Sequence, residues 1–285
     1  MKLRKVRALA LFTGIGIVLV AVLLGLPGVG QVQEKPVVVT TTAILGDFVQ
    51  KIAGDRAELV TLIPGGMCPA HYDVHPSDVG AVARAALVLN HGFEPWLEGL
   101  VKASGSKALV VTIGDDWNVP PNAIQQVSQV RDALETILPQ EATALQQNAA
   151  AYQKQIEDLA QNVLAQARQL EVQNVNVISQ TFQEKFVSWL GFTVIGTYPS
   201  PETVSAQLFL QLVQLGRAQK AALVVDNLQS GVGLGARMAF EIGALSVVLT
   251  NFPGAIPNTD DYLAIVAYNS EQLLTALQTY RGNAP

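Results

Sequence analysis

All three histidines of this sequence lie close together. The chain has 285 residues, and His71, His75 and His91 are its only histidines. Neutral imidazole is a preferred ligand of zinc and of other late first-row transition metals. The clustering therefore predicts part of a metal-binding site.

The histidines follow short apolar runs that are typical of buried parallel strands. His71 and His75 come after the run 58–63, and His91 comes directly after the run 87–90. Ligands of open α/β sheets bind at the carboxyl ends of the strands. We expect these two strands to be neighbours, so that His71 and His91 converge. His75 precedes a helix start, which favours a structural role for it.

Apolar runs alternate with helical patterns over 37–135 and again over 173–285. This alternation predicts two α/β lobes, each with a parallel sheet covered by helices. Between them, 141–170 contains neither Gly nor Pro and repeats apolar residues at steps of three and four, which predicts one long helix. At a rise of about 1.5 Å per residue it would span roughly 45 Å, enough to join two lobes across a cleft. A long surface helix packed on one domain is the alternative.

The N-terminal residues 1–30 have the layout of a secretory signal, with basic residues before the uncharged apolar run 8–26. That run is also nearly long enough to span a bilayer, so an uncleaved membrane anchor is the alternative. The only cysteine, Cys68, does not follow the run, which argues against a lipid anchor and excludes an internal disulfide. We expect export to the periplasm or to the outer face of the cytoplasmic membrane.

Composition narrows the function classes further. Hydrophobic residues make up 49% of the chain, and 18 Lys and Arg stand against 23 Asp and Glu. The apolar fraction predicts a sizeable core, and the negative net charge argues against a nucleic-acid-binding protein.

Four motifs carry a resemblance to a known family: Thr40 to Phe48, Ile63 to Met67 with a following His-Tyr-acid element, Pro76-Ser77-Asp78, and Asn122-Ala123. With them, nearly the whole chain after residue 36 resembles the cluster A-I substrate-binding proteins of ABC transporters, which capture zinc or manganese outside the cell. The resemblance implies two α/β lobes bridged by a rigid helix, a metal ion held between them, an ABC permease as partner and no enzymatic activity. We also expect a monomer.

The chain departs from the family pattern at the metal ligands. The family histidine of the first loop has moved one place to His71, and a second family histidine corresponds to Asp115 or Asp116. Gln180 takes the place of a third, and the usual final aspartate falls near Asn251. Three of the four positions therefore lack the family's residue type.

Other polar residues at strand ends could replace the lost ligands. We predict a tetrahedral site built from both lobes by four residues: His71, His91, Asp226 and Gln180. His75 is a less certain ligand, and whether Gln180 or Asp115 completes the site stays open. Two imidazoles favour zinc over manganese, which prefers oxygen donors. Asp73, Asp115, Glu184 and Cys68 are reserve ligands.

Two other functions remain open. The loss of family ligands allows the same fold to bind a metal chelate or a small organic molecule instead of a bare ion. A metal-dependent hydrolase is less favoured, because no H-E-x-x-H spacing occurs. The glycines at 231, 233 and 235 follow a strand, but their spacing differs from the G-x-G-x-x-G of dinucleotide-binding loops.

Overall fold

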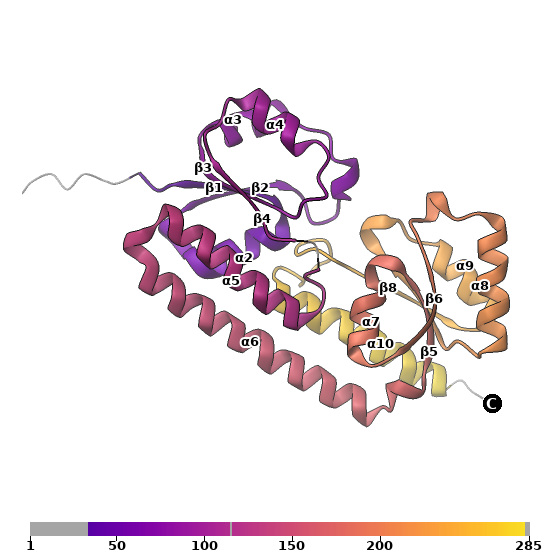
Figure 1. Cartoon of the computed structure of the whole chain (residues 1–285). Coiled ribbons are helices and arrows are strands. Elements are labelled where there is room, and N and C mark those ends of the chain that lie inside the picture. The colour runs from indigo at the N-terminus through magenta and orange to yellow at the C-terminus, as the bar shows by residue number, and fades with distance from the viewer. Residues whose placement is uncertain (1–33, 115, 283–285) are drawn as a thin grey trace, which may run out of the picture. The chain divides into compact units, whose positions relative to one another are not determined.

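The computed structural model describes residues 34–114 and 116–282. The expected signal or anchor at 1–30 and the reserve ligand Asp115 lie outside these described residues. Within the described part of the chain, no helix is both long and apolar enough to cross a membrane. The predicted fold class, two α/β lobes with parallel sheets and one long connecting helix, is confirmed (Figure 1).

The first lobe is built on a four-stranded parallel sheet in the order β2-β1-β3-β4. Its strands are β1 (Val37–Thr42), β2 (Glu58–Ile63), β3 (Ala85–Asn90) and β4 (Leu109–Thr112). The expectation that the strands before His71 and His91 are neighbours is wrong, because β2 and β3 pair with opposite edges of β1. The direction of strand addition reverses after β2, which places a topological switch point between the adjacent strands β1 and β3.

Helices cover both faces of this sheet. One face carries α2 (Ala43–Ala53) and α5 (Pro120–Ile137), and the other carries α3 (Pro76–Ala83) and α4 (Leu97–Ser104). No apolar periodicity in the sequence predicted α5. The available signal was Pro120 at the first helical position. Proline is favoured there because the N–H that it lacks would have no partner within the helix.

The second lobe repeats the plan with a parallel sheet in the order β6-β5-β7-β8. Its strands are β5 (Asn176–Gln180), β6 (Thr193–Tyr198), β7 (Leu223–Asn227) and β8 (Leu245–Leu249). The helices α8 (Ala206–Ala218) and α9 (Leu234–Ile242) pack on one face, and α7 (Glu184–Leu190) packs on the other.

The start of α8 differs from the sequence pattern. Ser200 followed by Pro201 is a pattern typical of a helix start, but Pro201 opens a short 3₁₀ turn here. The N-cap is Ser205, whose hydroxyl accepts a hydrogen bond from the backbone N–H of Leu208 at 3.1 Å. A serine hydroxyl in this position satisfies one of the free amides of the first turn.

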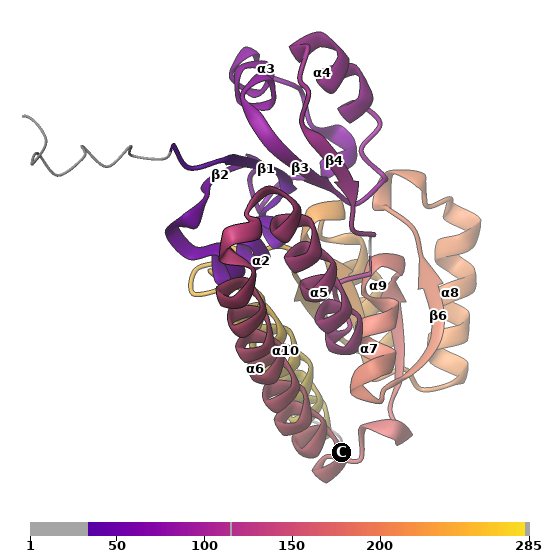
Figure 2. The ribbon, with the colours of Figure 1, turned by 60° about the vertical axis from the view of Figure 1, so that its left-hand side comes forward.

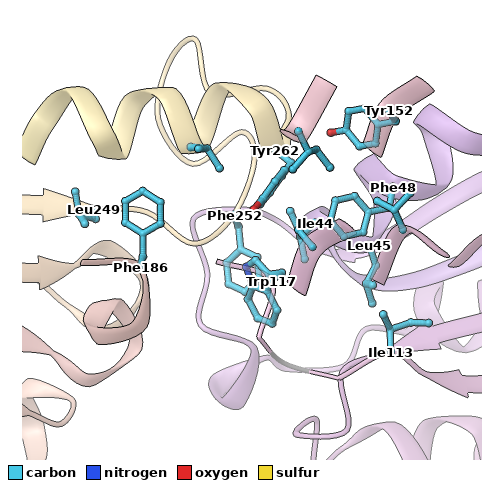
Figure 3. Close-up of a cluster of buried hydrophobic side chains, with 14 of the residues drawn as sticks. Ile44, Leu45, Phe48, Ile113, Trp117, Tyr152, Phe186, Leu249, Phe252 and Tyr262 are labelled. Carbon is cyan, nitrogen blue, oxygen red and sulfur yellow. The ribbon is translucent and has the colours of Figure 1, made fainter. Parts of the chain in front are cut away.

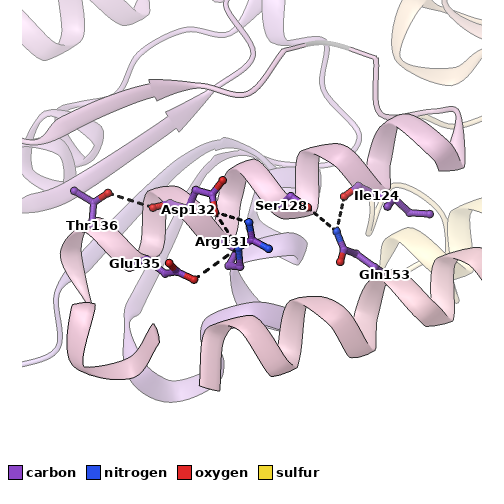
Figure 4. Close-up of polar contacts among 7 residues, drawn as sticks. All are labelled: Ile124, Ser128, Arg131, Asp132, Glu135, Thr136 and Gln153. Atoms are coloured by element: carbon purple, nitrogen blue, oxygen red, sulfur yellow. Dashed lines mark hydrogen bonds and ion pairs between the residues drawn. The ribbon is translucent and has the colours of Figure 1, made fainter. Parts of the chain in front are cut away.

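Two long helices run side by side from one lobe to the other (Figures 1 and 2). They are α6 (Ala142–Gln169), with 28 residues, and α10 (Tyr262–Gly282), with 21 residues. The side-chain amide of Gln153 in α6 ties it to α5, donating to the carbonyl oxygen of Ile124 at 2.8 Å and to the Ser128 hydroxyl at 2.7 Å (Figure 4). The end of α5 carries a separate set of polar contacts around Arg131, which bonds Asp132.

A single hydrophobic cluster connects the two lobes. It passes from Phe48 in α2 through Tyr152 in α6 and Tyr262 in α10 to Phe186 and Leu249 of the second lobe (Figure 3). The Phe48 ring meets the rings of Tyr152 and Tyr262 edge to face, with centroids 6.3 and 5.7 Å away. The described residues from 35 to 282 accordingly form one compact unit, in which separating the lobes would expose part of the core.

Candidate functional site

A cavity of about 400 Å³ lies where the loops after the strands of both lobes meet. Its walls come from the loops after β2, β3 and β4 in the first lobe and after β5, β7 and β8 in the second. The lining residues are Cys68, Pro69, Ala70, Phe93, Asp116, Trp117, Asn118, Thr181, Phe182, Lys185, Asn227, Gln229, Ser230, Asn251 and Phe252. This is the place where open α/β sheets bind their ligands.

Aromatic rings form much of the cavity wall. Trp117 stacks at a tilt against Phe252, with ring centroids 5.3 Å apart, and so joins the first lobe to the second. Behind it, the His91 ring lies 4.2 Å from Trp117 and stacks parallel to Phe93 at 5.3 Å. Phe182 projects from the other side with 55% of its surface exposed. The site thus offers flat apolar surfaces from both lobes.

Amide side chains supply most of the polar groups around the cavity. The Asn251 side-chain oxygen accepts hydrogen bonds from Asn118 at 3.1 Å and from Gln183 at 2.5 Å. The Asn251 backbone oxygen accepts from the Trp117 indole N–H at 2.9 Å. Asn118 also donates to the backbone oxygen of Phe182 at 3.1 Å. These bonds connect residues more than 60 positions apart. Those made by Asn118 and Trp117 hold the two lobes together at the cleft.

Gln229 makes a second connection between the lobes. Its amide nitrogen donates to the backbone oxygen of Gly65 and to the Thr250 hydroxyl, both at 2.9 Å, and its oxygen accepts from the Asn251 N–H at 3.0 Å. Gly65 is needed there, because a Cβ at this position would lie 1.9 Å from the backbone oxygen of Pro253.

Two charged side chains line the cavity, and they pair with each other. The Lys185 ammonium donates to the Asp116 carboxylate at 2.8 Å, and Asn122 donates to the same carboxylate oxygen at 2.8 Å. The pair joins α7 of the second lobe to the loop after β4 in the first lobe. The described lining therefore carries no net charge.

One polar atom in the lining is unsatisfied. Asn227 is fully buried at the end of β7, and its side-chain oxygen accepts from the backbone N–H and the hydroxyl of Ser230, both at 2.9 Å. Its side-chain nitrogen is buried and has no hydrogen-bond partner among the described residues. A buried donor without a partner costs about 1–3 kcal/mol, so such a donor in a cavity wall is a candidate ligand contact.

The predicted ligand His91 is buried behind the cavity wall, with 3% of its surface exposed. Its Nδ1 contacts the backbone oxygen of Gly114, and its Nε2 lies 2.8 Å from the Thr42 hydroxyl. A carbonyl oxygen only accepts, so Nδ1 carries the proton and Nε2 accepts from Thr42. The lone pair that a metal would need is engaged in this arrangement.

Glu94, which was not among the predicted site residues, fixes the turn that contains His91. Its carboxylate accepts from the backbone N–H groups of His91, Gly92 and Phe93 at 2.9–3.2 Å and from the Thr41 hydroxyl at 2.5 Å. The spacing of three residues from His91 to Glu94 was the available signal. This carboxylate works as a local cap that shapes the loop after β3.

Asp226 is also engaged by its own lobe. Its carboxylate accepts from the Tyr198 hydroxyl at 2.7 Å and from the backbone N–H groups of Gly235 and Gly233 at 3.0 and 3.1 Å. The glycine loop of 231–235 thus wraps the carboxylate at the start of α9. Asp226 is fully buried and does not line the cavity.

The other predicted ligands differ in their exposure to solvent. His71 is exposed at the end of a short 3₁₀ turn, and His75 is exposed just before α3, where its backbone N–H donates to Asp78 at 2.7 Å. Gln180 is buried, and its side-chain oxygen accepts from the Phe182 N–H at 2.6 Å. Across the described residues, no three His, Cys, Asp or Glu side chains, the reserve ligands Asp73, Glu184 and Cys68 included, gather as a metal-binding group.

Comparison with known proteins identifies the family. The family model for the zinc-uptake complex component A, periplasmic (ZnuA), matches residues 38–276. The chain belongs to the ZnuA family. This is a family of uptake-complex components, which agrees with the resemblance and with the expectation of a binding protein and not an enzyme.

Relatives of this ZnuA-family chain differ in the metal that their names state. The manganese-binding lipoprotein MntA of Halalkalibacterium halodurans is 30% identical over 149 residues, which cover 46% of this chain and 50% of the relative. The iron-binding protein YfeA of Yersinia pestis is 30% identical over 44% of this chain and 47% of the relative. The zinc-binding lipoprotein AdcA of Streptococcus pneumoniae is 26% identical over 45% of this chain and 32% of the relative. The matched stretches span about half of these relatives or less.

Solved structures support the same fold over a longer range. The periplasmic zinc-binding protein TroA of Treponema pallidum superposes with a TM-score of 0.75 at 21% identity, covering 86% of this chain and 99% of TroA. A periplasmic metal-binding protein of Candidatus Liberibacter asiaticus, in its manganese-bound form, has a TM-score of 0.75 at 18% identity, covering 85% of this chain and all of that one. At this level of identity the comparison speaks for the fold alone.

Proposed function

We propose that this ZnuA-family chain is the exported substrate-binding protein of an ABC importer and captures its cargo in the cavity between the two lobes. The observation that carries the proposal is the cavity itself, built by strand-end loops of both lobes. The N-terminal basic and apolar segment and the names of the relatives support a place at the outer face of the cytoplasmic membrane. The chain would deliver its cargo to a membrane permease as a monomer.

Photo-crosslinking in intact cells tests the importer assignment without knowledge of the cargo. The full chain would carry a photoreactive amino acid at exposed positions on both lobes, and cross-linked partners would be identified by mass spectrometry. We expect the transmembrane subunit of an ABC transporter among the partners. Efficient cross-linking to other proteins with no transporter subunit would contradict the assignment.

Zinc is the cargo that the sequence predicts, held by His71, His91, Asp226 and Gln180, with manganese less favoured. In the described structure Asp226 and His91 bond to protein groups, so zinc binding by this set would need both to be released. Calorimetric titration of zinc into the full chain tests the prediction, with His71→Ala and His91→Ala as variants and circular dichroism to verify folding. Binding that is micromolar or weaker and unaffected by both substitutions would contradict it.

A small organic molecule or a metal chelate is the second candidate cargo. The observation that favours it is the lining of the cavity, which presents aromatic rings, amides and one internal ion pair. Carboxylate and imidazole groups are what a bare divalent ion would require.

A further inference from the structure

We propose that the cavity between the lobes binds a compact organic molecule with a flat apolar part and no net charge, as the cargo of the importer. This inference rests on the proposed function and names the substrate class of the same site. Its motivation is the combination of a roomy cavity, an aromatic wall, a neutral charge balance and an unsatisfied buried donor.

The size of the cavity suits a small molecule. Its volume of about 400 Å³ is more than ten times the roughly 30 Å³ that one water molecule occupies in the liquid. Cavities that hold small organic ligands typically measure about 300–1,000 Å³. A dehydrated metal ion would leave nearly all of this space to water.

Both lobes contribute flat aromatic side chains to the cavity lining. Trp117 and Phe93 come from the first lobe, and Phe182 and Phe252 from the second. Because all four residues line the cavity, a ring or other flat apolar group bound there would be removed from water by both lobes. Stacking between offset or tilted rings adds about 0.5–1.5 kcal/mol per pair to this burial.

The charges of the described lining residues argue against a ligand with a large net charge. Among the described lining residues, Asp116 and Lys185 neutralise each other and the other side chains are uncharged. A divalent ion that lost its hydration shell here would find one carboxylate among the described lining residues, that of Asp116, which is already paired with an ammonium group. A neutral molecule leaves the pair intact, whereas a zwitterion can exchange partners with it, carboxylate to Lys185 and ammonium to Asp116.

Specific hydrogen bonds would come from the amide groups. The unsatisfied side-chain nitrogen of Asn227 would donate a hydrogen bond to an acceptor on the ligand. Asn118, Gln229 and Asn251 also line the cavity and already connect the lobes through hydrogen bonds. A ligand that contacts these amides would add bonds across the cleft and so favour the arrangement in which the lobes touch.

A ligand of this kind is either a free organic molecule or the organic part of a metal chelate. Calorimetry on the full chain separates these sources, with a panel of the free amino acids, nucleobases and nucleosides as probes, each titrated alone and with equimolar zinc. Zinc alone is the reference titration. Binding of a probe alone identifies the free molecule, and binding of the probe only together with zinc identifies the chelate.

Phe182→Ala and Phe240→Ala form a matched pair of variants for the test. Phe182 lines the cavity, whereas Phe240, 85% exposed on α9, lies outside it. We expect at least one probe to bind with a dissociation constant below about 100 μM and to bind about tenfold more weakly to Phe182→Ala, a change of about 1.4 kcal/mol. Phe240→Ala should bind it like the wild type.

Asn227→Asp is a second variant that keeps the accepting oxygen and replaces the unsatisfied donor. This variant should bind the same probe more weakly by a similar factor, because a carboxylate repels an acceptor on the ligand. The proposal is overturned if no probe binds at millimolar concentration, or if zinc alone binds at one equivalent and this binding disappears in His71→Ala. Neither result depends on the cross-linking experiment, so the importer assignment and the ligand class can fail separately.

Discussion

His91 and His71 are alike in sequence context and opposite in environment. His91 is buried among aromatic rings, with both ring nitrogens in contact with protein oxygen atoms, while His71 is exposed on a 3₁₀ turn. A buried ring that satisfies two polar groups contributes to stability whether or not it ever binds a metal. His71 has no comparable structural role.

His91→Ala should therefore destabilise the protein much more than His71→Ala. The first substitution removes a packed ring and leaves the Thr42 hydroxyl and the Gly114 carbonyl without their partner, so we expect a loss of about 2–4 kcal/mol. The exposed His71→Ala variant should stay within about 0.5 kcal/mol of the wild type. Urea denaturation followed by circular dichroism measures both, and equal stabilities would disprove the structural role of His91.

Asp47 connects three helices that belong to different parts of the molecule. It lies in α2, accepts a hydrogen bond from the Tyr152 hydroxyl of α6 at 2.6 Å, and accepts another from the Tyr262 N–H at the start of α10 at 3.1 Å. Burial raises the pKa of its carboxyl from 3.8 to about 6, and the hydrogen bonds and the nearby Lys51 only partly oppose the rise. The helices therefore meet around a group that titrates in the weakly acidic range.

The pH dependence of stability should reflect this group. Because the pKa of Asp47 is higher in the folded state, its contribution to stability is present below about pH 4 and is lost as the pH rises through about 6. The free energy of unfolding of Asp47→Asn minus that of the wild type should therefore increase by about 2 kcal/mol from pH 4 to pH 7. Urea denaturation across this range measures the gain.

Asp55→Asn provides the control for this titration. Its side chain is 93% exposed, with a weak ion pair to Lys35 at 3.9 Å. We expect its stability to run parallel to that of the wild type over the same pH range. If the stability of Asp47→Asn also runs parallel to that of the wild type over this pH range, Asp47 does not cause the pH dependence.

The two lobes are joined by both a common core and a set of polar contacts at the cleft. The core passes through α6 and α10, while Gln229, Trp117 and Asn118 make hydrogen bonds between the strand-end loops. The core resists separation of the lobes, so changes in the cleft should be small displacements of loops and not a wide opening. Gly65 lies at the tightest of these contacts.

Gly65→Ala should push apart the loops through which the two lobes contact each other. Its Cβ would meet the backbone oxygen of Pro253 at 1.9 Å, and the clash can be relieved only by moving one loop away from the other, at a cost of about 1–3 kcal/mol. We expect faster hydrogen exchange in residues 250–261 and weaker binding of any ligand that contacts both lobes. Hydrogen exchange with mass spectrometry measures the first effect.

Gly66→Ala is the matched control, because no atom lies within 4 Å of a Cβ at that position. It should leave exchange and binding as in the wild type. If both variants exchange alike in residues 250–261, the contact at Gly65 does not hold the lobes together.

The architecture could be predicted because its signals are local. Alternating apolar runs and helical periodicity indicated two α/β lobes, and a 28-residue helix lies where 141–170 predicted it. The family motifs lie within short segments as well. Where local signals were weak, the prediction failed, as for α5, whose polar composition and double proline hid an 18-residue helix.

The site depends on contacts between residues far apart in the sequence, and these could not be predicted. The strand order places β1 between β2 and β3, which separates the loops of His71 and His91. Thr42 engages His91 from 49 positions away, and Asn118 reaches Asn251 across 133 positions. Residue types alone suggested a metal site from four side chains. In the described structure two of them, His91 and Asp226, bond to other protein groups, and the cavity between the lobes is lined by aromatic rings, amides and one ion pair. The reason is physical: a side chain becomes a ligand only if the fold leaves its donor atoms free and brings several to one point.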